Sequence, residues 1–238
     1  MGSLLLLHNR QYYKRVLRTG PIAYWPQWEP SGTVAYDRTA NARNGAYTGV
    51  DLGQVGIGDG RVCPWFDGTN DYNNVYSAGL AGAFSGAEGS LMVWAKVNSA
   101  AVWADGILRE LAIFRVDASD KVEIYKNTTN NQVVVLRVGS NPFDAKSVAI
   151  AWSGTAWFCV GSTWSVSGDE LRVYLNGVQS GATQTGLTGF VGALANTSTC
   201  VGAVSTVPTN VWHGWLAHAC VWDRALTPSE VASLARVR

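Results

Sequence analysis

The sequence predicts an all-β protein, a two-sheet antiparallel β-sandwich (jelly roll) with a short N-terminal helical arm and a short C-terminal helix. Its composition is the first observation: 15% of the 238 residues are charged, while glycine reaches 26 and tryptophan 11. Such a chain suits short strands joined by tight turns. The second is that about a dozen apolar runs of strand length follow one another at a spacing of roughly 8–15 residues. The third is that almost no helical pattern interrupts them.

The two ends have helical patterns. Apolar residues are spaced as in a helix over residues 4–18, and Gly20-Pro21 ends that pattern. Near the C-terminus, Thr227 is an N-cap candidate, Pro228 fits the first helical position and Glu230 completes a capping box. We therefore predict a basic N-terminal arm over residues 1–20 and one jelly-roll domain over residues 21–238.

Strands between the ends are marked by alternation and by turn residues. In "SLMVWAKV", residues 90–97, alternate apolar side chains share a face. In "DELRVYLNGVQSG", Asn176-Gly177 supplies the positive φ angles of a two-residue hairpin turn. The stretch 211–222 predicts a long last strand. Because His213 and His218 are five positions apart on it, we expect them on opposite faces.

The segment "FDGTNDY", Phe66 to Tyr72, holds several oxygen-bearing side chains. A calcium loop spaces its oxygens as D-x-[DN]-x-[DN]-G and closes with a glutamate. Asp67 and Asp71 fall outside that spacing, and no glutamate follows before Glu88. The segment therefore predicts a tight turn between two strands.

Charge is distributed unevenly although the net charge is only +1. A nearly neutral chain gives no electrostatic reason to expect nucleic acid as a partner. Residues 1–20 nevertheless carry four basic residues and no acidic one. This pattern predicts either docking to an acidic surface or a solvated helix, and both remain open. The candidate docking residues are Tyr12, Tyr13, Lys14, Arg15 and Arg18.

The cysteines predict buried thiols. Cys63, Cys159, Cys200 and Cys220 form no C-x-x-C pair, which argues against zinc and redox motifs. Cys200–Cys220 is the one disulfide pairing to check. No apolar run approaches membrane-spanning length, and Leu4 to Leu7 is too short for a signal peptide, so we expect neither membrane contact nor export.

Four segments, in order, carry a resemblance to a known family. They are "AYWPQWEPSGTVAYDRTANARNGAYTGV", "FDGTNDYNNV", "DELRVYLNGVQSG" and "HACVWDRALTPSEVASL". Spread over residues 22–235, they resemble the laminin-G-like members of the concanavalin-A-like lectin and glucanase jelly rolls. The resemblance implies the same fold, with Phe66 packed inward and Asp67-Gly68 beginning a turn.

The layout, including "YYKRVLRTGPIAYWP", also resembles stand-alone jelly rolls among the virion components of tailed bacteriophages. That resemblance implies a non-catalytic capsid-decoration or tail-associated protein on the virion surface. The arm would bind other virion proteins or further copies of the chain, which makes a homo-oligomer the expected state.

Enzymatic activity is not expected. Glycosidases need two carboxylates, about 5–5.5 Å apart for retention or about 6.5–9.5 Å for inversion. On one strand such a pair lies at even spacing, as in an E-x-D-x-x-E run, and this chain has none. Asp169 and Glu170 are adjacent and so face opposite ways. Glu110 and Glu123 are interpreted as isolated.

Calcium is a possible cofactor that only the resemblance implies. Laminin-G-like domains often hold one calcium ion at the sheet edge, and the matching carboxylates are Glu29, Asp37, Asp67 and Asp223. The alternative is that these carboxylates accept hydrogen bonds in turns or pair with neighbours such as Arg224.

Aromatic side chains make carbohydrate binding the alternative function, since tryptophan and tyrosine faces stack on the apolar faces of sugars. Tryptophans in loops are better candidates than those on strands, and Trp103 is favoured. We expect at most two or three exposed aromatics together, because most tryptophans in a sandwich pack in its core. The candidates are Trp103, Trp94, Tyr174 and Trp212, with Trp164 and Trp215 also considered.

Overall fold

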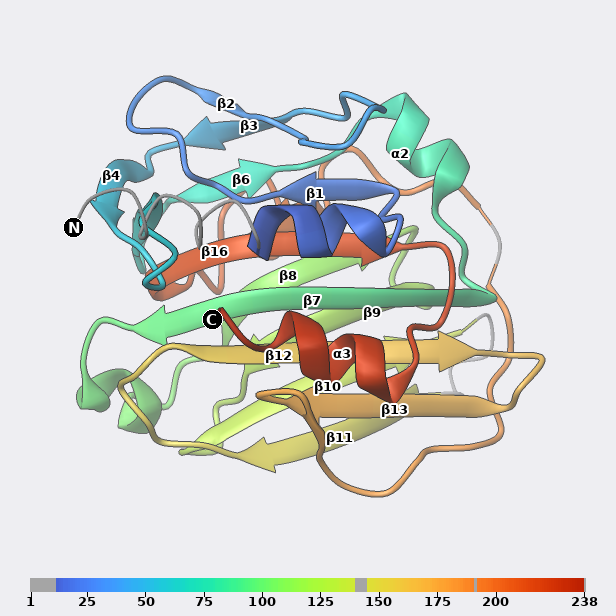
Figure 1. Ribbon diagram of the computed structural model, residues 1–238. Helices are drawn as coiled ribbons and strands as arrows, with labels where there is room; N and C mark the ends of the chain where they lie inside the picture. The colour runs from blue at the N-terminus through green and yellow to red at the C-terminus, as the bar shows by residue number, and fades with distance from the viewer. Residues whose placement is uncertain (1–11, 140–144, 191, 238) are drawn as a thin grey trace.

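The computed structural model describes residues 12–139, 145–190 and 192–237 and shows two antiparallel sheets packed face to face (Figure 1). Sheet A contains β1 (Ala23–Trp25), β4 (Asp51–Val55), β5 (Val62–Asp67), β7 (Glu88–Val97), β12 (Phe158–Ser165), β13 (Glu170–Leu175), β14 (Val178–Gln179) and β16 (His213–Trp222). Sheet B contains β2 (Val34–Ala35), β3 (Gly45–Thr48), β6 (Tyr72–Asn74), β8 (Arg109–Arg115), β9 (Lys121–Lys126), β10 (Gln132–Val138), β11 (Ala145–Ala151) and β15 (Thr199–Val201).

The order of the strands confirms the predicted β-sandwich. Sheet A runs β14-β13-β12-β7-β16-β5-β4, with β1 also paired to β16, and sheet B runs β11-β10-β9-β8-β15-β6-β3-β2. Because β16 lies beside β5 and β7, the last strand of the chain joins segments that are far apart in the sequence. Short helices complete the fold: residues 12–18, α2 (Ala78–Ala83), the 3-10 helix η1 (Ala100–Ala104) and α3 (Pro228–Leu234).

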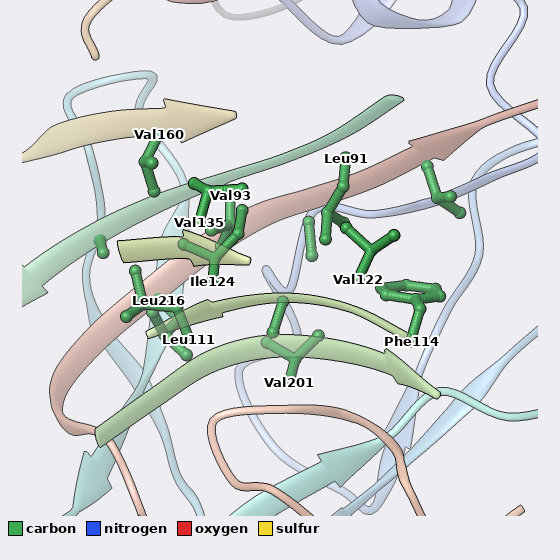
Figure 2. Close-up of a cluster of buried hydrophobic side chains, with 14 of the residues drawn as sticks. Leu91, Val93, Leu111, Phe114, Val122, Ile124, Val135, Val160, Val201 and Leu216 are labelled. Carbon is green, nitrogen blue, oxygen red and sulfur yellow. The ribbon is translucent and has the colours of Figure 1, made fainter. Parts of the chain in front are cut away.

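The main core fills the space between the sheets. Alternate residues of β7, among them Leu91 and Val93, point toward sheet B and meet Val122, Ile124 and Val135 there (Figure 2). All five are essentially inaccessible to solvent. Burying each such aliphatic side chain stabilises the fold by roughly 1.5–3 kcal/mol, which fixes the register of both sheets.

A second apolar layer covers part of the outer face of sheet A. The helix over residues 12–18 and helix α3 both lie across this face (Figure 1). Tyr12 is 3% exposed; its hydroxyl donates to the Leu234 carbonyl at 3.0 Å and accepts the indole N–H of Trp94 at 2.8 Å. The described part of the predicted arm therefore packs onto the sandwich, and Tyr12 is not available for docking to a partner.

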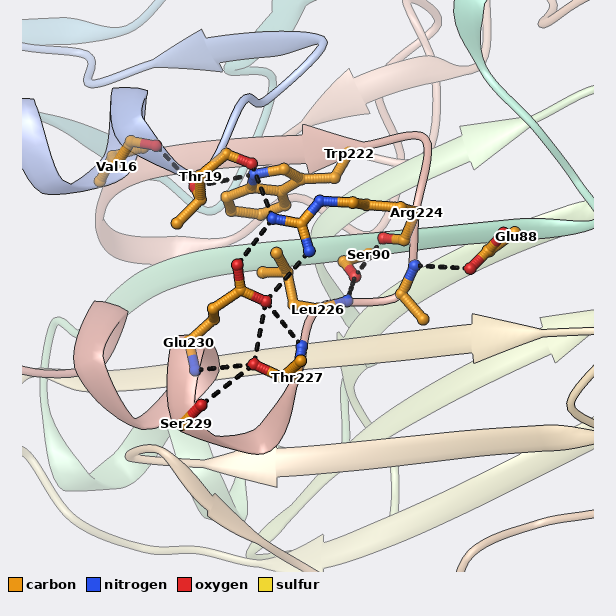
Figure 3. Close-up of polar contacts among 11 residues, drawn as sticks. Val16, Thr19, Glu88, Ser90, Trp222, Arg224, Leu226, Thr227, Ser229 and Glu230 are labelled. Atoms are coloured by element: carbon orange, nitrogen blue, oxygen red, sulfur yellow. Dashed lines mark hydrogen bonds and ion pairs between the residues drawn. The ribbon is translucent and has the colours of Figure 1, made fainter.

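Helix α3 begins with the predicted capping box. Thr227 accepts the backbone N–H of Glu230, and the Glu230 carboxylate accepts the backbone N–H of Thr227 at 2.8 Å. Arg224 donates to Glu230 at 2.7 Å and to the Thr19 carbonyl at 2.9 Å, and the Trp222 indole donates to the Thr19 hydroxyl (Figure 3). These contacts tie the two terminal helices to the end of β16.

The two turns predicted from local sequence are confirmed. Asp67 accepts the backbone N–H groups of Thr69 at 2.7 Å and Asn70 at 3.3 Å, so its carboxylate closes a turn. Asn176 and Gly177 adopt φ angles of 51° and 82° between β13 and β14. Both angles lie in the left-handed region that a two-residue hairpin turn requires.

The predicted placement of the two histidines is wrong. A bulge interrupts the pairing of β16 with β7 between Ala217 and Cys220, and His218 inside it has a φ of 52°. An extra residue in one strand reverses the alternation of faces. Both histidines consequently contact aromatic rings on the outer side of sheet A, His213 at Trp65 and His218 at Tyr12.

All four cysteines are buried free thiols, as predicted, and Cys200 is not bonded to Cys220. Burial raises the pKa of the Cys63 and Cys200 thiols to about 12. Within the described residues, every helix is too short or too polar to cross a bilayer.

Candidate functional site

The four aromatic residues predicted to contact a glycan are buried, so that prediction is wrong for each of them. Trp103 is 1% exposed, because it lies in η1 and donates its indole N–H to the Gly154 carbonyl. Trp212 and Tyr174 are also enclosed, at 0% and 2% exposed. Trp94 packs under Tyr12. None of these rings offers a face to a ligand.

Three other tryptophans are partly exposed on the outer face of sheet A. Trp215 in β16 lies opposite Trp65 in β5 and, on its other side, opposite Lys96 in β7. Trp157 directly precedes Phe158, whose partner in β7 is Ala95, next to Lys96. We call Trp157, Lys96, Trp215 and Trp65 the tryptophan row.

Strand alternation explains why these side chains face outward. Phe66, Leu216 and Phe158 are each fully buried in the main core, and each follows one of the three tryptophans in the sequence. Successive side chains of a strand point to opposite faces, so Trp65 and Trp215 point away from the core. Trp157, one residue before β12, packs against the outer apolar layer as well. Neighbouring strands are roughly 4.8 Å apart, which gives the row a length of about 14 Å across β12, β7, β16 and β5.

Polar groups accompany the row. The Lys96 ammonium lies 4.7 Å from the ring centroid of Trp215, and His213 packs edge-on against Trp65 at 6.2 Å. Partial burial, together with the charge of Arg109, lowers the pKa of His213, which favours the neutral imidazole. Flat ring faces with hydrogen-bonding groups beside them match the mixed apolar and polar surface of a sugar.

The predicted calcium ligands have other partners. Glu29 accepts hydrogen bonds from Arg38 and from the Tyr47 hydroxyl, both at 3.0 Å. Asp37 accepts the backbone N–H groups of Tyr24, Thr39 and Arg43. Asp223 is exposed just after β16. Across the described residues, no three acidic, histidine or cysteine side chains are grouped to hold a metal. Glu29 and Asp37 therefore pair with neighbours and stabilise turns, which is the alternative that the sequence left open.

Glu110 and Glu123 are not isolated from each other, contrary to the sequence-based interpretation. They lie on the paired strands β8 and β9. Burial, and then the charge of Glu123, raise the pKa of Glu110 well above its usual value. Glu110 is only 1% exposed, so its carboxylate does not reach solvent in this structure.

Comparison with known proteins identifies the family. Residues 67–232 match a laminin-G-type family model described as the concanavalin A-like lectin/glucanases superfamily. The chain belongs to this superfamily. The match confirms the family and fold inferred from the order of sequence motifs. No curated protein is significantly similar to the sequence.

Solved structures share the fold of this superfamily member at low sequence identity. Domain 4 of AbnA, a GH43 extracellular arabinanase from Geobacillus stearothermophilus solved with arabinotriose, is 16% identical with a TM-score of 0.64; the alignment covers 91% of this chain and 98% of that one. The botulinum neurotoxin serotype D ligand-binding domain, solved with N-acetylneuraminic acid, is 13% identical with a TM-score of 0.65, covering 90% and 50%. The serotype G binding domain is 13% identical with a TM-score of 0.65, covering 91% and 50%. The chain spans about half the length of the neurotoxin domains.

Of the three tryptophans in the row, Trp215 was among the glycan-binding candidates predicted from the sequence, whereas Trp65 and Trp157 were not. Alternation around Phe66 and Phe158 was the available signal, since it places each preceding tryptophan opposite a core residue. The pairing of β16 with β5 is what brings Trp215 beside Trp65, and no local pattern contains that pairing.

Proposed function

We propose that the protein is a non-catalytic carbohydrate-binding protein and that the tryptophan row is its binding face. The observation that carries the proposal is the placement of three partly exposed tryptophans in one line across sheet A. The superfamily includes lectins, which makes a glycan ligand consistent with the fold. The structurally similar arabinanase domain and serotype D neurotoxin domain were each solved with a carbohydrate bound.

The row is partly exposed beside the apolar layer that the terminal helices cover. The terminal helices cover the outer face of sheet A at Trp94, while Trp215 and Lys96 lie beyond them toward the strand ends. A linear polysaccharide laid along the row would stack successive sugars on Trp157, Trp215 and Trp65. Stacking on each ring would contribute roughly 1 kcal/mol beyond the area it buries.

Affinity electrophoresis in gels that contain soluble arabinan, xyloglucan, laminarin or galactomannan tests the proposal. We expect wild-type protein to be retarded by at least one polymer. Replacement of Trp215 by alanine should weaken that retention about tenfold, since the loss of one stacking contact costs about 1.4 kcal/mol. Val207→Ala is the control, because Val207 is an apolar residue that is 77% exposed and lies in the loop between β15 and β16, outside the row. Equal retention of Trp215→Ala, Trp65→Ala and wild type would overturn the assignment of the row.

We further propose that the protein is displayed on a phage particle. The support for this proposal is the resemblance of the layout to virion-associated jelly rolls. With Tyr12 buried, the exposed Lys14 and Arg18 are the residues proposed to contact virion proteins or another copy of the chain. Sedimentation of particles followed by mass spectrometry tests it: we expect the chain in the particle pellet in high copy, and a chain that stays in the supernatant contradicts a virion role.

A further inference from the structure

A second cluster on the protein surface stacks two arginines on aromatic rings. The Arg61 guanidinium lies 4.7 Å from the ring centroid of Trp28, and the Arg38 guanidinium lies 5.3 Å from it. Arg38 also lies 5.0 Å from the ring of Tyr36, which is 45% exposed. Tyr13 packs against Trp28 at 5.4 Å. We call Tyr36, Arg38, Trp28 and Arg61 the arginine ladder.

The two arginines differ in their polar partners. Arg38 is paired with Glu29 at 3.0 Å, and its Nε is buried with no hydrogen-bond partner among the described residues. Arg61 is exposed and forms no ion pair within the described part of the chain. Its backbone N–H donates to Asp59, whose other carboxylate oxygen contacts His218. The Arg61 guanidinium therefore lies over the ring of Trp28, while its N–H donors remain available to a ligand.

The arginine ladder and the tryptophan row lie on the same face of the sandwich. Arg61 comes just before β5, and Cys63 and Trp65 follow at alternate positions, so all three point outward from sheet A. Four residues of extended strand place Arg61 roughly 13 Å from Trp65. Cys63 between them is fully buried, and Ile57 packs against the same apolar layer. A polymer that extends over about 13 Å would contact both clusters at once.

Unpaired positive charge marks this face. Lys96 in the tryptophan row, like Arg61, forms no ion pair within the described residues. The carboxylates of this region have other partners: Glu29 binds Arg38, and Asp59 binds His218. At the β5 end of the row, Asp67 accepts the backbone N–H groups of Thr69 and Asn70, and the exposed Asp51, the cross-strand partner of Trp65, accepts from Gln54. A neutral sugar would leave both cations unused. A guanidinium fork instead matches a carboxylate or sulfate group through paired N–H donors.

We propose that the ligand of this face is an acidic polysaccharide, whose sugars stack on the tryptophan row while its carboxylate or sulfate groups bind Arg61 and Lys96. This inference rests on the proposed carbohydrate-binding function and names the class of glycan. It also assigns the arginine ladder as a subsite separate from the stacking surface.

Affinity electrophoresis with matched polymers provides the test. Polygalacturonate carries carboxylates, dextran sulfate carries sulfates, and unmodified dextran carries neither. We expect wild-type protein to bind at least one of the acidic polymers, with an affinity that falls as salt rises. Arg61→Gln should weaken that binding about tenfold, since a hydrogen bond to a charged group is lost. Arg61→Lys, which keeps the charge without the fork, should retain the salt dependence and recover part of the affinity.

Arg172→Gln is the charge-matched control, because Arg172 pairs with Glu170 on β13, away from both clusters. Near-ultraviolet circular dichroism of each variant checks that it is folded.

If Arg61→Gln and Arg172→Gln bind the acidic polymers equally well, the arginine subsite is overturned. If wild type binds only neutral polymers and Trp215→Ala abolishes this, the carbohydrate proposal stands and the acidic ligand is wrong. If poly-glutamate binds as tightly as the polysaccharides and Trp215→Ala changes nothing, the face takes acidic protein segments and both proposals fail.

Discussion

At the residue scale, Glu230 couples an ion pair to a helix cap. The hydrogen bond from Arg224 is the largest of the effects that lower the pKa of Glu230, to about 2 from 4.5. A lowered pKa means that the stabilisation from the carboxylate is complete above about pH 4.5 and is lost as the pH falls toward 2. We predict that Glu230→Gln destabilises the fold at pH 7 by about 1 kcal/mol at most, because solvent screens the pair. The difference from wild type should shrink between those two pH values in urea titrations.

Glu170→Gln is the matched comparison for this prediction. Glu170 also pairs with an arginine, Arg172 at 2.7 Å, but its carboxylate caps no helix. An equal loss of stability in both variants would show that the capping box adds nothing beyond an ordinary surface ion pair.

At the element scale, the helix over residues 12–18 is held by the burial of Tyr12. Its ring packs edge-on against His218 at 4.8 Å, and its hydroxyl links Trp94 to helix α3. Removal of a buried aromatic ring costs roughly 3–5 kcal/mol. We predict that Tyr12→Ala lowers the free energy of unfolding by about 3 kcal/mol, whereas Lys14→Ala, at an exposed position, changes it by less than about 0.5. Chemical denaturation measures both, and a Tyr12→Ala variant as stable as wild type would contradict the role given to this helix.

The elements that depend only on residues close together in the sequence were the ones that could be predicted. The Asn176-Gly177 hairpin, the Thr227 capping box and the Asp67 turn each depend on neighbouring residues, and each occurs as predicted. The arm was predicted less well, because its basic residues gave no sign that Tyr12 and Val16 would fill an apolar layer on sheet A. The bulge at His218 has no local signal either, since it follows from the pairing of β16 with β7.

At the scale of the whole molecule, the candidate site was not predictable from local sequence, because it depends on which strands pair. Trp103 was favoured because it lies between strands, yet η1 folds inward and encloses it between Phe158 and Trp212. The tryptophan row needs β12, β7, β16 and β5 side by side, and those strands are scattered through the chain. Composition showed that tryptophans are abundant, but only the topology separates the few that face solvent from the many in the core.

The molecule has two apolar layers, and the reactivity of cysteine thiols in different places measures how each part opens. Cys159 and Cys220 lie in the layer under the terminal helices, whereas Cys200 lies in sheet B between β6 and β8. The helices cover one face from the ends of the chain, so we expect them to open at lower denaturant concentration than the paired sheets. A thiol reacts as its thiolate, and burial raises the pKa of all three groups, so native protein should react slowly. Pulsed alkylation with peptide mass spectrometry across a urea series should then label Cys159 and Cys220 before Cys200. Labelling of all three at one midpoint, coincident with the change in tryptophan fluorescence, would instead mean that the helical layer and the sandwich unfold as a single cooperative unit.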